Sequence, residues 1–431
     1  LVEAILYPPF LEFSAGRGRG QPGILLCPAA AAVRGRRHPD APTPRIQCEP
    51  YGYKCGGKLK SDLPDEARRR LEMLTARIGA RPLGSDANRS ATEFVASELA
   101  ALGFAVERQG FDCLHWRAGR AALHVAGETF ELYPGPYSPG ITTTGPVLAA
   151  ATLDELRDLE RNRPSAEPRG ASPLILLAHG RLCKEQLVPK NYPFYQIEEH
   201  QEICRLLESI NPAAIVAATG RDPGAAAGLY PFPWIEDGDF DIPSAYIKDV
   251  EGERLRLLLE STAGADDVTL EIDSERLATR GENVIARMHR GTGWGEGTRR
   301  VVLTAHIDTK PATPGALDNA AGVVVQILAA GLLARHEGGP LGADRSDDPP
   351  GVEVAILNGE DDYAAAGQIA YLSAGGVDNA ALVVNVDGAG LSGVPVAFSF
   401  YGDGYVVGAA QDAFGRGLVD AWARDSLIEG P

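Results

Sequence analysis

The last third of the chain alternates short apolar runs with a longer apolar stretch. Runs of Val, Ile, Leu and Ala occupy residues 301–305, 352–357 and 382–386, and each has the length and composition of a buried parallel strand. Between the first two, residues 323–333 are apolar over three turns and predict a crossover helix. This order predicts an α/β protein with a mixed, mostly parallel central sheet flanked by helices.

The same alternation begins near residue 62. Leu63-Pro-Asp-Glu predicts a helix start with proline in its first turn. Ser85 or Asp86 is suited to cap a second helix, which Gly103 would end, and residues 104–108 predict a strand. The middle of the chain repeats the strand–helix pattern, with strands predicted at 173–178, 213–218 and 243–247 and helices at 196–208 and 250–259.

Length and charge narrow the classes of function. A chain of 431 residues exceeds one ordinary core and indicates two domains with extensions. The formal net charge of −17 argues against nucleic acid and anionic membrane surfaces as partners, and no apolar run of 18 residues predicts a spanning helix. The six cysteines form no Cys-x-x-Cys pair and do not identify the cellular compartment, although the cytoplasm is slightly favoured. The sequence does not indicate an oligomeric state.

Two segments differ in composition from the rest. Residues 1–60 contain eight Pro and eight Gly and are basic within an acidic chain, so residues 1–58 are expected to be a disordered tail or non-native upstream sequence. Residues 337–351, rich in Gly, Pro and acidic side chains, predict a solvated loop.

Metal-capable side chains follow each apolar run of the last third. His306 and Asp308 follow the first run, Asp318 opens the predicted crossover helix, Glu360 and Asp361 follow the second run, and Asp387 follows the third. Singly, an Asp before a helix is more often an N-cap, and a His after a strand is more often a loop residue. Jointly, they would meet at the carboxyl edge of one sheet, where ligands bind in α/β folds. An imidazole with several carboxylates suits a divalent metal, zinc above all.

The order of these segments resembles the di-zinc aminopeptidase family. The matching motifs are His306-Ile-Asp308, Gly315-Ala-Leu-Asp318-Asn-Ala-Ala-Gly322, Gly359-Glu360-Asp361 and Asn385-Val-Asp387. Upstream, Arg81-Pro-Leu-Gly84-Ser85 with Asn88, and Asn283-Val-Ile-Ala, resemble the family's opening segment and the strand before its metal motif. The similarity runs from about residue 62 to the end. Residues 112–277 resemble the protease-associated domain inserted in some members, which implies catalytic parts at 59–111 and 278–431.

The resemblance implies a role for each site residue. Asp318 would bridge two zinc ions about 3.5–4 Å apart. One zinc would also take His306 and Asp387, and the other would take Asp361 and a late His. Glu360 would be the general base, and Asp308 would orient the His306 ring through its other nitrogen. Members of the family also carry a cis peptide at the position of Asp318-Asn319.

Two departures from the family pattern affect these expectations. Many relatives have Glu at the position of Asp361. No His follows His336, so the second zinc would lack its last ligand, and the chain is expected to be truncated at its C-terminus and weakly active or unstable. The implied function is a zinc-dependent metallo-exopeptidase, most simply an aminopeptidase that acts on peptide or aminoacyl substrates.

Two alternatives remain open at this point. One is a catalytically silent binding protein on the same fold, and the other is a dinuclear carboxypeptidase or amidohydrolase. His179 and His200, in the predicted insert, also invite a metal site. We expect neither to bind metal, because His179 ends a strand and His200 falls on a charged face of its helix.

Overall fold

The computed structural model describes residues 63–162, 173–190, 197–219, 233–262, 268–288, 294–295, 297–311, 313–335, 350–361 and 365–390. Residues 66–390 make up one compact unit, and the description below concerns that unit. The predicted tail at 1–58 and nearly all of the predicted loop at 337–351 lie outside the described residues.

The part of the sheet that carries the candidate site is built around three short strands. β9 (Arg300–His306) lies between β10 (Gly351–Leu357) and β11 (Ala380–Asn385), and both pairings are parallel. β10 pairs on its other side with β8 (Val268–Met288) in antiparallel register, and β8 pairs with β1 (Ala105–Val125). The three apolar runs of the sequence therefore form neighbouring strands, and the mixed α/β sheet predicted from them is confirmed.

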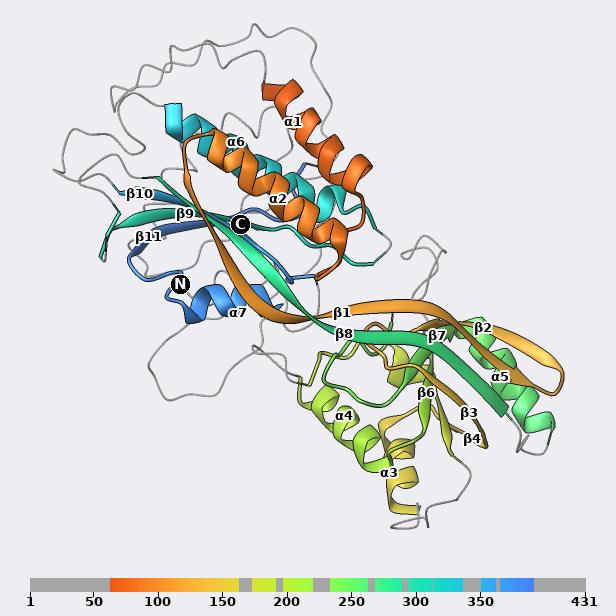
Figure 1. Ribbon diagram of the computed structural model, residues 1–431. Helices are drawn as coiled ribbons and strands as arrows, with labels where there is room; N and C mark the ends of the chain where they lie inside the picture. The colour runs from red at the N-terminus through yellow and green to blue at the C-terminus, as the bar shows by residue number, and fades with distance from the viewer. Residues whose placement is uncertain are drawn as a thin grey trace, which may run out of the picture. The chain divides into compact units, whose positions relative to one another are not determined.

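Helices cover both faces of this part of the sheet (Figure 1). α1 (Leu63–Glu72), α2 (Asp86–Ala101) and α6 (Ala321–Arg335) lie on one face, and α7 (Ala366–Ser373) lies on the other. Ser85 caps α2 by accepting a hydrogen bond from the Asn88 backbone N–H at 3.0 Å, as the sequence suggested.

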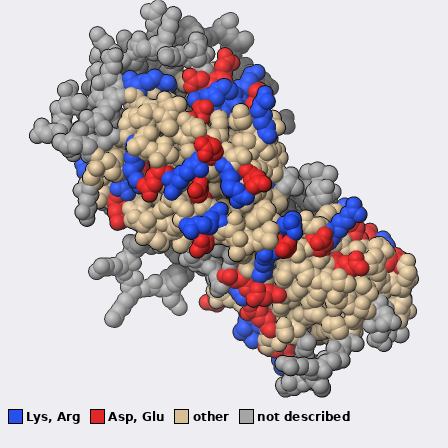
Figure 2. All heavy atoms as spheres, in the orientation of Figure 1, with Lys and Arg blue, Asp and Glu red and all other residues tan. Residues whose placement is uncertain are grey.

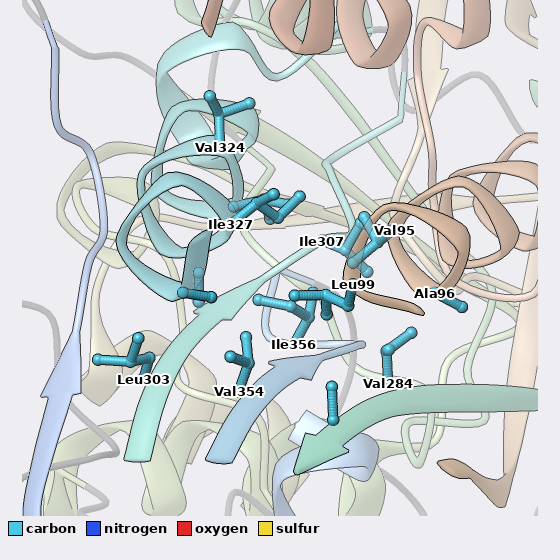
Figure 3. Packing of buried hydrophobic residues seen from close by; sticks show 14 of the residues in the cluster. Val95, Ala96, Leu99, Val284, Leu303, Ile307, Val324, Ile327, Val354 and Ile356 are labelled. Carbon is cyan, nitrogen blue, oxygen red and sulfur yellow. The ribbon is translucent and has the colours of Figure 1, made fainter. Parts of the chain in front are cut away.

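The main core lies between the sheet and the helices α2 and α6 (Figure 3). Val95 and Leu99 of α2 meet Ile327 of α6 above strand residues such as Leu303 and Ile356. All five are at most 5% exposed, so the strand ends that carry the polar residues stand on a closely packed base.

The helix α6 is apolar on most sides, with one face in the core and Val325 and Leu332 exposed. Together with the preceding turn it spans Ala316–Arg335, which has the length and composition of a membrane span, with 50% of its most apolar window buried in the protein. Val323, Val324 and Ala330 pack into the main core beside the sheet. Length and composition alone therefore do not distinguish a helix in a protein core from a helix that spans a membrane.

Two long strands run between the candidate-site region and the middle of the chain. β1 and β8 pair antiparallel from Ala105↔Arg287 to His124↔Thr269, with one irregularity between Ala118 and Ala121. The expected insert boundaries at 112 and 277 therefore fall inside continuous strands. Backbone pairing gives no break at these positions, and the division into domains stays a prediction.

The middle of the chain forms a second set of parallel strands. Its elements are β2 (Glu128–Pro134), β3 (Ile141–Gly145), β4 (Val147–Ala150), α3 (Leu153–Asn162), β5 (Ile175–Ala178), α4 (Glu198–Ile210), β6 (Ala214–Thr219), β7 (Ser244–Lys248) and α5 (Asp249–Ser261). β4, β5, β6 and β7 are parallel neighbours, and β2 joins them to β1. One core lies under α3 and α4 and another under α5. The strands and helices predicted here are confirmed to within a few residues.

Charged residues are interspersed on the surface of the described part. On the face shown in Figure 2, Lys and Arg side chains alternate with Asp and Glu and form no large region of one sign. Among the described residues, Arg256 pairs with Glu253 and Arg254 pairs with Glu128. This mixture is the ordinary solvated surface of a globular protein.

Candidate metal centre

Parallel pairing brings the ends of β9, β10 and β11 to one edge of the sheet. His306, the last residue of β9, lies opposite Leu357 of β10, and Thr304 of β9 lies opposite Asn385 of β11. Ile307 N donates to Leu357 O at 2.9 Å, so the pairing continues past the strand end. The polar segments that follow these strands consequently start side by side.

His306 lies at the centre of the group of acidic residues. Its Nε2 is 3.0 Å from Asp318 Oδ1, 3.4 Å from Asp387 Oδ1 and 3.7 Å from Glu360 Oε2. The side chain is 3% exposed, whereas that of Asp318 is 60% exposed. The sequence prediction that these side chains meet at one sheet edge therefore agrees with the geometry.

The ionisation of His306 reflects its acidic surroundings. Burial alone would lower the pKa of His306, but the carboxylates of Asp308, Asp318 and Asp387 outweigh burial and hold the pKa well above its ordinary value. Neither ring nitrogen makes a hydrogen bond of acceptable geometry within the described part of the chain. A buried imidazole surrounded by carboxylates, with both nitrogens unpartnered, is suited to a cation.

Asp308 anchors the loop that carries Glu360 and Asp361. It is fully buried, and its Oδ1 accepts hydrogen bonds from Gly359 N at 2.7 Å and Glu360 N at 3.2 Å, while its Oδ2 accepts one from Asp361 N at 2.8 Å. Burial opposes the charge of Asp308, but His306 and these N–H groups hold its pKa below the ordinary value. Its Oδ1 is 3.6 Å from His306 Nδ1, so the role of orienting the ring stays a prediction. The sequence did not show the three backbone contacts.

Asp318 lies in a tight turn (Ala316–Ala320) before α6, and Asn319 fixes this turn. The peptide bond between Asp318 and Asn319 is cis. Asn319 Nδ2 donates to Val386 O at 2.8 Å, and Gly322 N donates to Asn319 Oδ1 at 2.9 Å. A Cβ on Gly322 would lie 2.2 Å from Asn319 Oδ1 and 2.3 Å from Val386 O, so only glycine permits this approach. The turn of Asp318 is thereby held against the segment of Asp387.

Glu360 and Asp361 carry the most perturbed carboxyl groups at the edge. Burial is the main cause that raises the pKa of Glu360 to about 6, with further increases from Asp308, Asp387 and Asp318 and an opposing effect of His306. Burial likewise raises the pKa of Asp361 to about 8, and Lys310 and His306 oppose it. Acidic groups with raised pKa values are the usual sign of a site that binds a cation or transfers a proton.

An amide network beneath the edge was only partly visible in the sequence. The side chains of Asn88 and Asn358 exchange two hydrogen bonds, Nδ2 to Oδ1 at 2.8 Å and 2.9 Å. Asn283 Oδ1 accepts from Asn358 N at 3.0 Å. All three are at most 1% exposed, so the network joins α2, β8 and the end of β10 directly before Gly359. The motifs that contain Asn88 and Asn283 were noted in the sequence, but their connection to the site was not.

The family comparison agrees with this geometry. Residues 283–420 match the model of peptidase family M28. This segment is therefore similar to the M28 peptidases. It includes every one of the six predicted site residues, from His306 to Asp387.

Individual relatives support the same family and fold. The chain is 25% identical over 260 residues to a probable lipoprotein aminopeptidase of Mycobacterium tuberculosis, an alignment that covers 58% of this chain and 45% of that protein. A solved zinc aminopeptidase from Bacillus subtilis matches with a TM-score of 0.56 and 19% identity over 82% of this chain and 76% of the other. A peptidase M28 precursor from Shewanella amazonensis SB2B matches with a TM-score of 0.50 and 19% identity, covering 75% and 73%. The chain thus spans less than half of its curated relative and has the fold of the zinc aminopeptidases.

The segment that matches the M28 model contains two groups of side chains that could hold a metal ion. His306, Asp318 and Asp361 form one group and His306, Glu360 and Asp387 the other, and the ligand atoms within each group lie within 4.8 Å of one another. Because the ring nitrogens of His306 make no hydrogen bond among the described residues, this donor set fits zinc. His306 belongs to both groups, whereas the family resemblance gives the bridging position to Asp318.

His179 and His200 belong to no such group among the described residues. His179 directly follows β5, as expected. The expectation that His200 lies on a charged helix face is wrong, because the residue lies on the buried face of α4, is 9% exposed, and accepts a hydrogen bond at Nδ1 from Val188 N at 3.2 Å. A loop not evident in the sequence covers that face of α4, and burial lowers the pKa of His200.

Proposed function

We propose that the chain is a zinc-dependent metallo-exopeptidase of the aminopeptidase type, acting on peptide or aminoacyl substrates. The observation that carries this proposal is the buried His306, whose ring nitrogens make no hydrogen bond among the described residues and whose Nε2 has three carboxylates within 3.7 Å. The M28 match over residues 283–420 supports the reaction class. The names of the relatives, among them an aminopeptidase of Mycobacterium tuberculosis, support the choice of amino- over carboxypeptidase.

Two zinc ions would be held at the sheet edge. His306, Asp318 and Asp387 would hold one ion, and Asp318 and Asp361 the other, with a late His expected from the family resemblance as its further ligand. Bound zinc would lower the pKa of a water molecule toward about 7 and polarise the substrate carbonyl. The 60% exposure of the Asp318 side chain is compatible with a bridging position open to water and substrate.

Glu360 is the proposed general base. Its carboxylate oxygen lies 3.7 Å from His306 Nε2, so it faces the same small volume as the ligands. A group with a pKa of about 6 is largely ionised at neutral pH, accepts a proton from water and returns it to the leaving amine. Asp308 fixes this carboxylate indirectly, because it binds the backbone N–H groups of Gly359, Glu360 and Asp361.

A zinc determination and a substrate panel test the proposal together. The purified chain is expected to bind zinc and to release the first residue from free aminoacyl and peptide substrates, while N-blocked substrates remain intact. Hydrolysis of blocked substrates only would favour a carboxypeptidase or amidohydrolase. Zinc binding without any hydrolysis would favour a silent binding protein, and absence of zinc binding would overturn the metal centre itself.

A further inference from the structure

Arg81 is a fully buried arginine that lies outside the matched M28 segment, between the π-helical segment Met73–Ile78 and α2. Among the described residues its guanidinium donates five hydrogen bonds, and each of these acceptors is a backbone carbonyl. Nε donates to Ile307 O at 2.9 Å, Nη1 to Leu74 O, Gly79 O and Pro314 O at 3.1, 3.0 and 2.7 Å, and Nη2 to Gly315 O at 3.2 Å. In addition, Arg81 N donates to Thr309 Oγ1 at 2.9 Å.

Three of these carbonyl acceptors, together with Thr309, belong to the two segments that carry the central site residues. Ile307 and Thr309 flank Asp308 and directly follow His306, whereas Pro314 and Gly315 precede Asp318 by a few residues. One rigid, planar group therefore bonds to both segments and fixes their separation. A Cβ on Gly315 would lie 2.2 Å from Thr309 Cγ2 and 3.1 Å from Arg81 Nη2, which shows how closely the two segments approach at this point.

The positive charge of Arg81 lies near the site, but its guanidinium does not hydrogen-bond to the carboxylate oxygens that would bind the metal. Burial lowers its pKa to about 10, against the influence of Asp308, Asp361 and Asp318, so the group remains a cation at neutral pH. Within the described residues its side-chain hydrogen bonds go to carbonyl oxygens and to no carboxylate. The carboxylates remain available to a metal ion, while a nearby cation offsets part of their mutual repulsion.

We propose that Arg81 is a positioning residue of the metal centre. It sets the distance between the His306–Asp308 segment and the Asp318 turn, and thereby the affinity and the geometry with which zinc is held. This inference rests on the proposed zinc site and adds a residue from a part of the chain that precedes the M28 segment. Lysine would keep the charge at this position but lacks the planar fork that reaches both segments.

Arg70 provides a matched control in the same region. It is 6% exposed, and its guanidinium bonds to Glu98 at 2.7 Å and to Glu66 at 3.2 Å, so it is a buried arginine with a purely structural ion-pair network in α1 and α2. Replacing either arginine by methionine removes a buried cation and preserves much of the side-chain volume. Comparing the two variants separates a general loss of stability from an effect on the metal.

The experiment measures zinc affinity by chelator competition, and melting temperature, for the wild-type chain and for Arg81→Met, Arg81→Lys and Arg70→Met. Loss of a group that orients metal ligands costs about 10–100-fold in metal affinity. We expect a loss of that size for both Arg81 variants and a change of less than about threefold for Arg70→Met. The cobalt-substituted Arg81 variants should also show a shifted visible absorption band, which reports coordination geometry.

Specific outcomes would overturn the inference. Unchanged zinc affinity and cobalt spectrum in Arg81→Met, with only a lower melting temperature, would make Arg81 a structural residue. Tighter zinc binding in Arg81→Met would show that repulsion between the two cations outweighs positioning. If Arg81→Met does not fold, Arg81→Lys is the deciding variant. A zinc affinity equal to that of the wild type in Arg81→Lys would exclude a role for the planar guanidinium. If the wild-type chain binds no zinc, the metal centre and the role of Arg81 fail together, whereas wild-type binding with unaffected Arg81 variants overturns the role alone.

Discussion

This protein has two sets of parallel strands, and in each set a histidine lies at the end of one strand. A candidate metal site forms at only one of these two strand ends. β9 ends at His306, and β5 is followed directly by His179. Both strands are almost wholly buried, and both lie between parallel neighbours. Around His306, the chain places carboxylates after β10, after β11 and before α6. Around His179, no group of three potential ligands occurs among the described residues.

The comparison shows that a strand-end histidine acquires a function only through its neighbours. The edge at β9–β11 combines carboxylates from segments far apart in the sequence, and a buried aspartate holds one of these segments by its backbone. The middle strands use their ends for turns and packing instead. The following experiments compare these two regions, beginning with the largest expected effect.

Glu360→Gln should reduce turnover of an aminoacyl substrate by about 10²–10⁴-fold, because a general base contributes that much. The amide is nearly isosteric and leaves His306, Asp318 and Asp387 in place, so zinc content should remain close to that of the wild type. Steady-state kinetics and metal analysis of the same preparation test both statements. Full activity in this variant would contradict the assignment of the base.

Asp318→Ala should release most of the bound zinc, because the carboxylate nearest to His306, at 3.0 Å from its Nε2, is removed. Asp86→Ala is a control that removes another exposed aspartate near the start of a helix, the first residue of α2. Metal analysis after dialysis should show near wild-type zinc for the control and little for Asp318→Ala. Equal zinc content in Asp318→Ala and Glu360→Gln would contradict the assignment of Asp318 as the bridging ligand and of Glu360 as the general base.

Part of the candidate site, including the proposed bridge Asp318 and the proposed base Glu360, could be predicted from the sequence. The convergence of His306, Asp318, Glu360 and Asp387 followed from their positions after apolar runs, because parallel strands necessarily share an edge. The contacts of Arg81 did not follow, since three of its acceptors are backbone carbonyls more than 220 residues away and any residue type supplies those. The burial of His200 was missed for a similar reason, because an irregular loop with no periodic pattern covers it.

Removing a contact between the two regions should have a smaller effect on the kinetics. Lys310, four residues after His306, places its Nζ 2.6 Å from Oε1 of Glu236 in the middle of the chain, and Gln186 Nε2 donates to Oε2 of the same carboxylate at 2.6 Å. Lys310→Met should change the KM of a peptide substrate by a few fold and stability by under about 1 kcal/mol, since the lysine is 46% exposed.

The control for this contact is Lys190→Met, which breaks the Lys190–Glu208 pair within the middle region. We expect no change in KM for the control. If both variants give the same kinetics, the Lys310–Glu236 contact does not influence the approach of substrate to the metal centre.

The pH dependence of zinc stabilisation is a further test of the edge. Glu360 and Asp361 have raised pKa values of about 6 and about 8, and that of His306 is raised as well, so the metal-free folded chain binds more protons than the unfolded chain above about pH 4. The contribution of these groups to metal-free stability therefore decreases as pH rises toward 8. Zinc has to displace those protons, so its effect on the melting temperature should be larger at pH 8 than at pH 6. A larger effect at pH 6 would contradict the assignment of His306 and Asp361 as ligands.

The smallest effect is expected from the histidines of the middle region. His179→Ala and His200→Ala should change the turnover of a small aminoacyl substrate by less than about tenfold, which corresponds to roughly 1.4 kcal/mol. His200→Ala should lower the melting temperature more than His179→Ala, because His200 is buried and accepts a hydrogen bond from Val188 N. Thermal unfolding and kinetics on both variants separate the two effects. If either variant lost turnover by more than tenfold while its melting temperature stayed at the wild-type value, the middle region would contribute directly to the chemistry. The contrast between the two strand ends would then be wrong.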